Sequence, residues 1–280
     1  MRLQAGMTAV VTGAASGIGR ALAERFAVAG LRVVLADVEE GALERAVAEL
    51  RDSGHEVLGV GTDVMSRVSV EALAERAAST FADVHVLCNN AGVLSASTGA
   101  VWELPEADWE WVLGVNFRGV LHGVQAFVPR MLAQGSEGHV VNTASIFGLL
   151  PARGPYDVSK HAVVALSEAL RTDLRSRSAR VSVSVVCPGL VQTGLASAER
   201  NRGAGLGERQ EANAIVSLAI AKGIAASEVA DAVFEAVEGD RFWVLTHRDL
   251  DAAVRARVEE MLGGAVAAAR TRRRRREAGA

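Results

Sequence analysis

The chain has 280 residues, a net charge of −3, 50 % hydrophobic residues and a mean hydropathy of +0.20. A chain of this length can bury a large core, and because no stretch approaches the ~18 unbroken apolar residues of a membrane helix, we expect no membrane span. The first apolar run, from Met7, leads into a glycine motif rather than a signal peptide, and Cys88 and Cys187 are too few for a disulfide framework, so we expect a cytoplasmic protein.

Strand-like and helical patterns alternate along the chain. Apolar, β-branched runs predict strands at 7–13, 32–37, 55–64, 84–92, 139–145, 180–189 and 241–247. Helical periodicity predicts helices after the first strand and over 39–53, 66–82, 105–134, 155–178 and 227–240. The strand runs are almost continuously apolar, as in parallel strands covered on both faces. The fold class is therefore predicted to be α/β, with a doubly wound parallel sheet.

We find no internal linker, so residues 1–269 are expected to form one domain. Within it, residues 194–223 are polar and contain glycines, which fits either a mobile lid over a site or a plain surface insertion. The end of the chain, 270–280, carries six arginines, and we expect a disordered, solvated tail. Without those arginines the net charge would be −9, which is unfavourable for binding nucleic acid.

The stretch "TGAASGIG" at 12–19 follows the first strand and opens the first helix. Its glycines would let the backbone turn tightly and approach a pyrophosphate, which the helix N-terminus would also attract. An ordinary tight turn is the alternative, but an acidic residue at the end of the second strand, Asp37, favours a dinucleotide site. The residues expected to contact the cofactor here are Gly13, Ser16, Gly17, Ile18 and Gly19.

Asp37 lies 24 residues after Gly13, where a carboxylate would accept hydrogen bonds from a ribose 2′-hydroxyl and repel a 2′-phosphate. Its neighbours Ala15 and Val38 are not basic, so we favour NAD over NADP as the cofactor. Asp63, after the third strand, could bond an adenine amino group or serve only as a turn or cap residue.

Tyr156 is the one tyrosine of the chain, and Lys160 is one of two lysines among its 30 basic residues. On a helix over 155–178 they are four positions apart and share a face. A phenol has a pKa near 10, and bringing it to about 7 needs ~4 kcal/mol of differential stabilisation. Lys160 and the positive ring of an oxidised nicotinamide could supply this together, which would make Tyr156 a general base. Lys160 could also donate to the nicotinamide ribose, or be a solvated helix residue.

Two further polar residues fit such a reaction. Ser145, at the end of the fifth strand, could hold the substrate oxygen, or bond only to backbone. Asn116 lies in a helical run, where asparagine is unfavourable, and its side chain could hold a water that connects Lys160 to solvent. A partly buried helix polar residue is the alternative for Asn116.

These motifs together resemble the short-chain dehydrogenase/reductase family: "TGAASGIG", "NNAG" at 89–92, Asn116, Ser145, "YDVSK" at 156–160 and "PGLVQT" at 188–193. The resemblance implies a Rossmann-type, seven-stranded sheet and an Asn–Ser–Tyr–Lys tetrad. Such proteins are often homotetramers joined through the helices that carry Asn116 and Tyr156, so the resemblance implies a homotetramer or a dimer. The further cofactor contacts that it implies are Val64, Asn90, Ala91 and Gly92 toward the adenosine, Pro188, Gly189, Val191 and Thr193 at the nicotinamide end, and the catalytic residues Tyr156 and Lys160.

The family usually has a slightly longer loop between its serine and tyrosine, which here are 11 positions apart. Thr143 is therefore a rival for the hydroxyl role, but Ser145 keeps the family register. The resemblance implies a substrate site at Leu94, Ser145, Phe147, Leu149 and Leu190. Because these are mostly apolar, we expect an NAD-dependent oxidoreductase for a mostly hydrophobic secondary alcohol or ketone. An NADP-dependent ketoreductase and a non-catalytic dinucleotide sensor are the alternatives.

Overall fold

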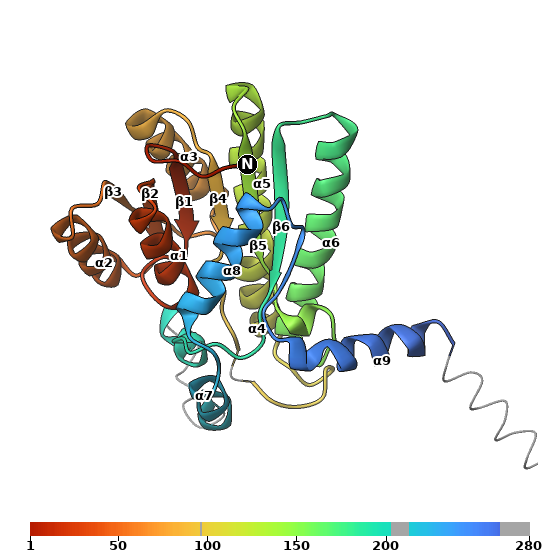
Figure 1. Ribbon diagram of the computed structural model, residues 1–280. Helices are drawn as coiled ribbons and strands as arrows, with labels where there is room; N and C mark the ends of the chain where they lie inside the picture. The colour runs from red at the N-terminus through yellow and green to blue at the C-terminus, as the bar shows by residue number, and fades with distance from the viewer. Residues whose placement is uncertain (96, 203–212, 264–280) are drawn as a thin grey trace, which may run out of the picture.

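The computed structural model describes residues 1–95, 97–202 and 213–263, and there a single parallel sheet forms the centre of the molecule (Figure 1). Its seven strands lie in the order β3-β2-β1-β4-β5-β6-β7, and all neighbours pair in parallel. The predicted fold class is confirmed. The strands are β1 (Thr8–Thr12), β2 (Arg32–Asp37), β3 (Val57–Gly61), β4 (Val86–Asn89), β5 (Gly138–Thr143), β6 (Val181–Cys187) and β7 (Trp243–Leu245).

Helices cover both faces of the sheet (Figure 1). One face packs against α1, α2 and α8, and the other against α3, α5 and α6. The described helices are α1 (Gly17–Val28), α2 (Glu40–Asp52), α3 (Arg67–Phe81), α4 (Glu106–Leu113), α5 (Gly119–Gln134), α6 (Pro155–Ser176), α7 (Asn213–Ala221), α8 (Ala226–Glu238) and α9 (Asp251–Met261). The predicted helix over 105–134 is interrupted by a π turn at Gly114–Arg118, and the sequence patterns did not predict α7 or α9.

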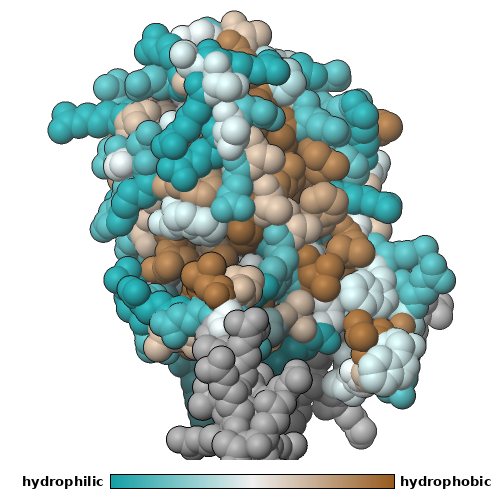
Figure 2. All heavy atoms as spheres, turned by 90° about the vertical axis from the view of Figure 1, so that its right-hand side faces the viewer, coloured by the Kyte–Doolittle hydropathy of each residue, from teal (hydrophilic) through white to brown (hydrophobic). Residues whose placement is uncertain are grey.

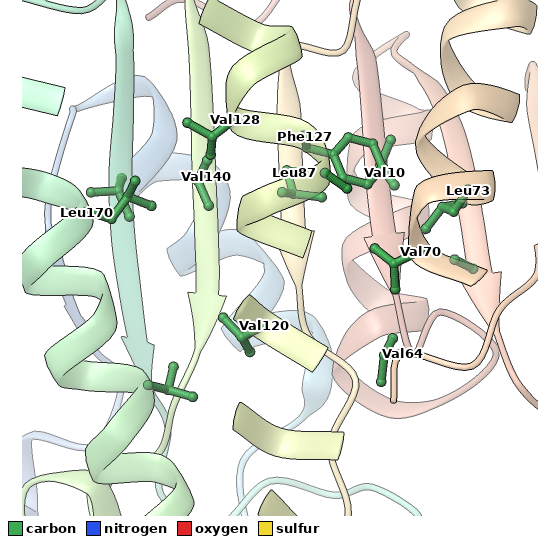
Figure 3. Packing of buried hydrophobic residues seen from close by; sticks show 14 of the residues in the cluster. Val10, Val64, Val70, Leu73, Leu87, Val120, Phe127, Val128, Val140 and Leu170 are labelled. Atoms are coloured by element: carbon green, nitrogen blue, oxygen red, sulfur yellow. The ribbon is translucent and has the colours of Figure 1, made fainter. Parts of the chain in front are cut away.

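The strands are apolar along their whole length because both of their faces are buried. On one face Val10, Leu87 and Val140 lie in register on three neighbouring strands, beneath Phe127 of α5 (Figure 3). Their chain neighbours, such as Val11, point to the opposite face and pack under α1 and α8. Each strand therefore stabilises two cores, which is the physical reason for the unbroken apolar runs.

Strand order reverses between β1 and β4, so the loops after these two strands diverge and leave a crevice at the carboxyl edge of the sheet. Ligands of such open α/β sheets bind at this point. Strands β1 to β6 all end at this edge, so the predicted site residues in the segments that follow them lie there.

Two expectations, that the chain has no membrane span and that it forms a homotetramer, concern the helices and the surface of the protein. None of the helices in the described part of the chain has the length and apolar character needed to span a bilayer. On the side that carries α6, hydrophobic residues gather in patches among hydrophilic ones (Figure 2). These patches do not establish an oligomeric state, and the homotetramer stays a prediction. The arginine tail at 270–280 and the middle of the expected lid, 203–212, lie outside the described residues.

Candidate active site

A cavity of about 960 Å³ opens at the carboxyl edge of the sheet and is large enough for a dinucleotide end and a small substrate. Most of the predicted site residues line it. They are Gly13, Ser16, Gly17, Ile18, Asp37, Asp63, Val64, Asn90, Ala91, Gly92, Leu94, Ser145, Phe147, Tyr156, Lys160, Pro188, Gly189, Leu190, Val191 and Thr193. Three predicted residues do not line it, namely Gly19, Asn116 and Leu149.

The glycine loop forms one end of the cavity. Gly13 has a φ of +65°, which favours glycine, and a Cβ on Gly19 would lie only 2.0 Å from the carbonyl oxygen of Gly13. Gly19 therefore allows α1 to approach the loop and does not itself contact the cavity. Ser16, the N-cap of α1, makes no side-chain capping bond, so N–H groups of the first turn remain available to an anion. This cradle fits a pyrophosphate.

Acidic groups lie at the end of the cavity that is predicted to hold the adenosine. The Asp37 carboxylate is almost fully buried and accepts hydrogen bonds from the backbone N–H of Ala15 (2.9 Å) and Glu39 (3.0 Å). It therefore fixes the glycine loop and still offers lone pairs to a ribose. Asp63 lines the same wall and accepts from the N–H of Met65 (2.9 Å), so it does act as a turn residue, and its predicted bond to adenine stays a prediction.

Arg200 brings a cation to this end that sequence reasoning missed. It donates to both carboxylate oxygens of Glu39, at 2.6 and 3.2 Å, and lines the cavity. Hydrogen bonding and the charge of Arg200 lower the pKa of Glu39 despite its partial burial. The charge of Arg200 is therefore already compensated. It lies 163 positions after Asp37, in a polar stretch whose pattern does not indicate where it folds.

Tyr156 and Ser145 meet at the opposite end. Tyr156 lies in the first turn of α6, and its phenol is hydrogen-bonded to the Ser145 hydroxyl. Ser145 also donates to the carbonyl of Pro188 (3.2 Å) and accepts from the N–H of Phe147 (3.2 Å). The rival hydroxyl of Thr143 instead donates to the side chain of Asn90 (3.3 Å). The geometry thus favours Ser145 as the residue that shares a proton with the phenol.

Without a bound cofactor, Lys160 does not lower the pKa of Tyr156. Burial raises the pKa of Tyr156 to about 12, and the neighbouring Asp157 charge adds to this, although hydrogen bonding with Ser145 opposes it. Lys160 Nζ lies 5.6 Å from the centre of the phenol ring. At that distance the ammonium does not offset the cost of burying a phenolate, so the lysine alone does not make Tyr156 a base near pH 7.

Lys160 is itself buried, with 3 % of its surface exposed. Its ammonium donates to the carbonyl of Thr143 (3.0 Å), and burial lowers its pKa from 10.5 to about 8. A solvated helix position is therefore excluded. Because Lys160 also lines the cavity, its remaining N–H groups can reach a ligand.

Asn116 lies in the π turn between α4 and α5, which explains how an asparagine is accommodated in this helical run. Its side chain accepts from the N–H of Val93 (2.7 Å) and donates to the carbonyl of Val93 and the hydroxyl of Ser159, both at 3.0 Å. It therefore holds the segment after β4 against α6. A Cβ on Gly92 would lie 3.4 Å from both Asn116 Oδ1 and Lys160 Nζ, so both side chains lie close to the backbone of Gly92.

Apolar side chains line much of the cavity that contains Tyr156. Phe147 and Leu190 are among them, as predicted, whereas Leu149 packs against the core instead. Sequence reasoning missed the contribution of α4, whereas α7 lies within the expected lid segment, 194–223. The apolar lining residues added by the structure include Trp111, Val115, Leu195, Ala198, Val216 and Ile220.

A buried ion pair ties the segment after β6 to α4. Arg202 pairs with Asp108 and with Glu199 (3.2 Å), and its guanidinium lies 5.1 Å from the ring centre of Trp111. The Asp108 and Arg202 side chains are 1 % and 5 % exposed, so little water screens their attraction. The described part of the expected lid is thus anchored across the cavity. Among the described residues, no cluster of His, Cys, Asp and Glu suits a metal ion.

Comparison with known proteins agrees with this geometry. Residues 7–203 match the family model for short chain dehydrogenases. The 1-deoxy-11-beta-hydroxypentalenate dehydrogenase of Streptomyces arenae is 40 % identical over 258 residues, which cover 90 % of this chain and 86 % of that protein. The CLA biosynthesis dehydrogenase/reductase of Lactiplantibacillus plantarum is 34 % identical over 264 residues, or 90 % of this chain and 92 % of that protein.

A solved structure is similar over nearly its whole length. The short chain dehydrogenase/reductase of Burkholderia phymatum, in complex with NAD, is 47 % identical and superposes with a TM-score of 0.89. The match covers 93 % of this chain and 96 % of that chain. Sequence motifs, fold and relatives thus agree, and the chain belongs to the short-chain dehydrogenase/reductase family.

Proposed function

We propose that the protein is an NAD-dependent oxidoreductase that interconverts a secondary alcohol and a ketone, with Tyr156 as general acid and base. The observation that carries this proposal is the convergence of Tyr156, Ser145 and Lys160 on the wall of one cavity that also reaches the glycine loop. A core tyrosine and a surface lysine would not meet in this way. The dehydrogenase names of the relatives support the same reaction class.

The residues present can carry out the proton part of this reaction. Bound NAD supplies the acceptor for the hydride that leaves the alcohol carbon. Ser145 would hold the substrate oxygen through its hydroxyl, and Tyr156 would receive the hydroxyl proton as the C=O bond forms. In the reverse direction Tyr156 returns that proton to the oxygen. Lys160 would stabilise the phenolate and donate to the ribose beside the nicotinamide.

The adenosine end supports NAD over NADP. A 2′-phosphate there would meet the carboxylates of Asp37 and Glu39, and the one cation that lines this end in the described residues, Arg200, is paired with Glu39. Repulsion from Asp37 would raise the free energy of bound NADP more than that of bound NAD. The NAD complex of the Burkholderia phymatum protein is in line with this choice.

The charge of Asp37 should decide the cofactor preference. Asp37→Asn keeps an oxygen that can accept from Ala15, so the loop should stay in place while the repulsion is lost. We expect NADH to bind about tenfold more weakly and NADPH about tenfold more tightly than in the wild type, a change of ~1.4 kcal/mol each. Dissociation constants from the fluorescence of the two reduced cofactors measure this. Equal shifts for both would show that the substitution only loosened the loop.

The substrate should be mostly apolar. Trp111, Phe147, Leu190 and Ile220 line the same cavity as Tyr156, and a polar substrate would lose hydration against them without gaining partners. A panel of secondary alcohols of increasing apolar size, oxidised with NAD, should show kcat/KM rising with apolar area until the cavity is filled. Tight NADH binding without turnover of any alcohol or ketone would instead support a dinucleotide sensor.

A further inference from the structure

His247 lies behind the loop that forms the nicotinamide end of the candidate site. It follows β7 at the carboxyl edge of the sheet and does not line the cavity. Gly189 and Leu190, which do line the cavity, are its hydrogen-bond partners. The imidazole therefore contacts this loop from the protein side while a ligand would contact it from the cavity side.

The ring replaces a missing part of the β-ladder. Strands β6 and β7 pair in register up to Cys187 and Leu245. The next residue of β6, Pro188, has no N–H, so regular pairing ends there. Beyond it, the N–H of Gly189 donates to His247 Nδ1 (2.9 Å), and His247 Nε2 lies 3.0 Å from the carbonyl oxygen of Leu190. One side chain thus pairs with backbone groups of two consecutive loop residues, the N–H of Gly189 and the carbonyl of Leu190.

These contacts define which nitrogen carries the proton. The hydroxyl of Thr246 lies 2.9 Å from Nδ1, so two donors, this hydroxyl and the N–H of Gly189, converge on that nitrogen. Nδ1 must then be an acceptor, and Nε2 must carry the proton that it donates to Leu190. Only the neutral ring in this tautomer can make both loop contacts.

Gly189 makes room for the imidazole. A Cβ at this position would lie 2.7 Å from both Cγ and Cδ2 of His247, closer than carbon atoms approach one another. Position 189 therefore has to be glycine to leave room for the ring of His247. The two residues form a unit, and a larger residue at 189 would displace the ring that holds the loop.

The two bonds differ in importance. The carbonyl of Leu190 also accepts from the N–H of Ile224 (3.1 Å), so it stays paired without the histidine. The N–H of Gly189 has Nδ1 as its acceptor, and losing that acceptor frees the start of the loop. The acceptor function of His247 should therefore be the decisive one.

We propose that His247 is a positioning residue that fixes the Pro188–Val191 loop for the nicotinamide end of the cofactor, an inference that rests on the proposed function. It acts through the loop and touches neither cofactor nor substrate. Its loss should weaken binding of the nicotinamide half and leave binding of the adenosine half unchanged.

Calorimetric titration with NADH and with ADP-ribose, which lacks the nicotinamide, separates these halves. In His247→Phe, which keeps a ring but neither bond, we expect NADH to bind about tenfold more weakly and ADP-ribose within about twofold of the wild type. His247→Asn keeps an acceptor near Nδ1 and should bind NADH almost as the wild type does. His247→Gln keeps only a donor near Nε2 and should resemble the Phe variant more closely. Equal losses for NADH and ADP-ribose in the Phe variant, or no loss, would overturn the proposal.

Amide exchange of Gly189, followed by NMR without any ligand, tests the inference independently of the proposed function. It should be faster in His247→Phe than in His247→Asn, and the ¹⁵N signals of wild-type His247 should show a proton on Nε2. If the wild type bound neither ligand, the proposed function would fall, while the exchange rates would still decide the role of His247. Equal exchange rates of the Gly189 amide in the two variants, or a proton on Nδ1, would overturn the proposed role of His247. If His247→Phe does not fold, the comparison of His247→Asn with His247→Gln decides the same question.

Discussion

Tyr156→Phe should lower kcat by about 10³-fold or more while the dissociation constant of NADH stays within about twofold of the wild type. The substitution removes one oxygen, the atom that would exchange a proton with the substrate, and leaves the ring. Because the phenol is hydrogen-bonded to Ser145 at the far end of the cavity from the glycine loop, its loss should not disturb cofactor binding. Steady-state turnover of the best alcohol in the panel, together with NADH fluorescence titration, measures both quantities.

Ser145→Ala and Thr143→Val provide the matched controls. Both remove a hydroxyl near the end of β5, but the Thr143 hydroxyl is bonded to Asn90 rather than to the phenol. Ser145→Ala should lose about 10²-fold in kcat and Thr143→Val much less, in keeping with a hydroxyl that holds the reacting oxygen. Turnover that survives in Tyr156→Phe, or a greater loss in Thr143→Val than in Ser145→Ala, would refute the assignment of these residues.

Lys160→Met should lower kcat by about 10²-fold to 10³-fold and weaken NADH binding by about tenfold or more. Methionine fills the buried volume of the lysine stem but has neither the charge that would stabilise a phenolate nor donors for the ribose. Lys160→Arg keeps the charge, yet the guanidinium is too broad for the space between Gly92 and Thr143, so it should not restore activity. The same turnover and fluorescence assays measure these losses.

The stability of Lys160→Met distinguishes a functional loss from a structural one. The pKa of the lysine is lower in the folded protein (about 8) than in the unfolded chain (10.5), so the buried ammonium destabilises the fold below pH 8 by about 3 kcal/mol at most. That cost disappears as the pH rises from 8 to 10.5, because the folded state loses its proton first. Part of it is offset by the bond to Thr143. The variant should therefore be as stable as the wild type or more so at pH 7, and a large loss of stability would point to a purely structural lysine.

Much of the fold was predictable because it depends on local patterns. Runs such as Val33–Ala36 are buried on both faces, and this burial produces the continuous apolar stretches that indicate parallel strands. Gly13 is required by its positive φ, and Gly19 by the close approach of the Gly13 carbonyl oxygen. Both lie within one short motif, so the sequence indicates them directly. The spacing of Tyr156 and Lys160 also reports their shared helix face directly.

Features that depend on long-range contacts were not predictable in this way. Arg202 and Asp108 are 94 positions apart, and neither has a sequence context that distinguishes it from a surface charge. His247 is recognisable as a partner of Gly189 only once β6 and β7 lie side by side. The raised pKa of Tyr156 in the protein alone was not predictable for a related reason, because helix spacing shows the nearby ammonium but not the burial of the phenol.

The raised pKa of Tyr156 bears on when this residue can act as a general base. In the protein alone, burial outweighs the lysine, so the phenol should become basic near neutral pH only when the positive nicotinamide ring is also present. Reduced cofactor, whose ring is neutral, should not have this effect. The proton-transfer step is thus expected to be switched on by the bound, oxidised cofactor.

The chain has one tyrosine, so the ultraviolet absorbance of tyrosinate reports Tyr156 without interference from other phenols. Titrating this absorbance against pH, in the free protein and in the presence of saturating NAD, measures the claim most directly. We predict a midpoint near pH 12 for the free protein and one at least about two pH units lower in the NAD complex. The same midpoint in both would contradict the account, because the phenol would then lack the charge that makes it a base.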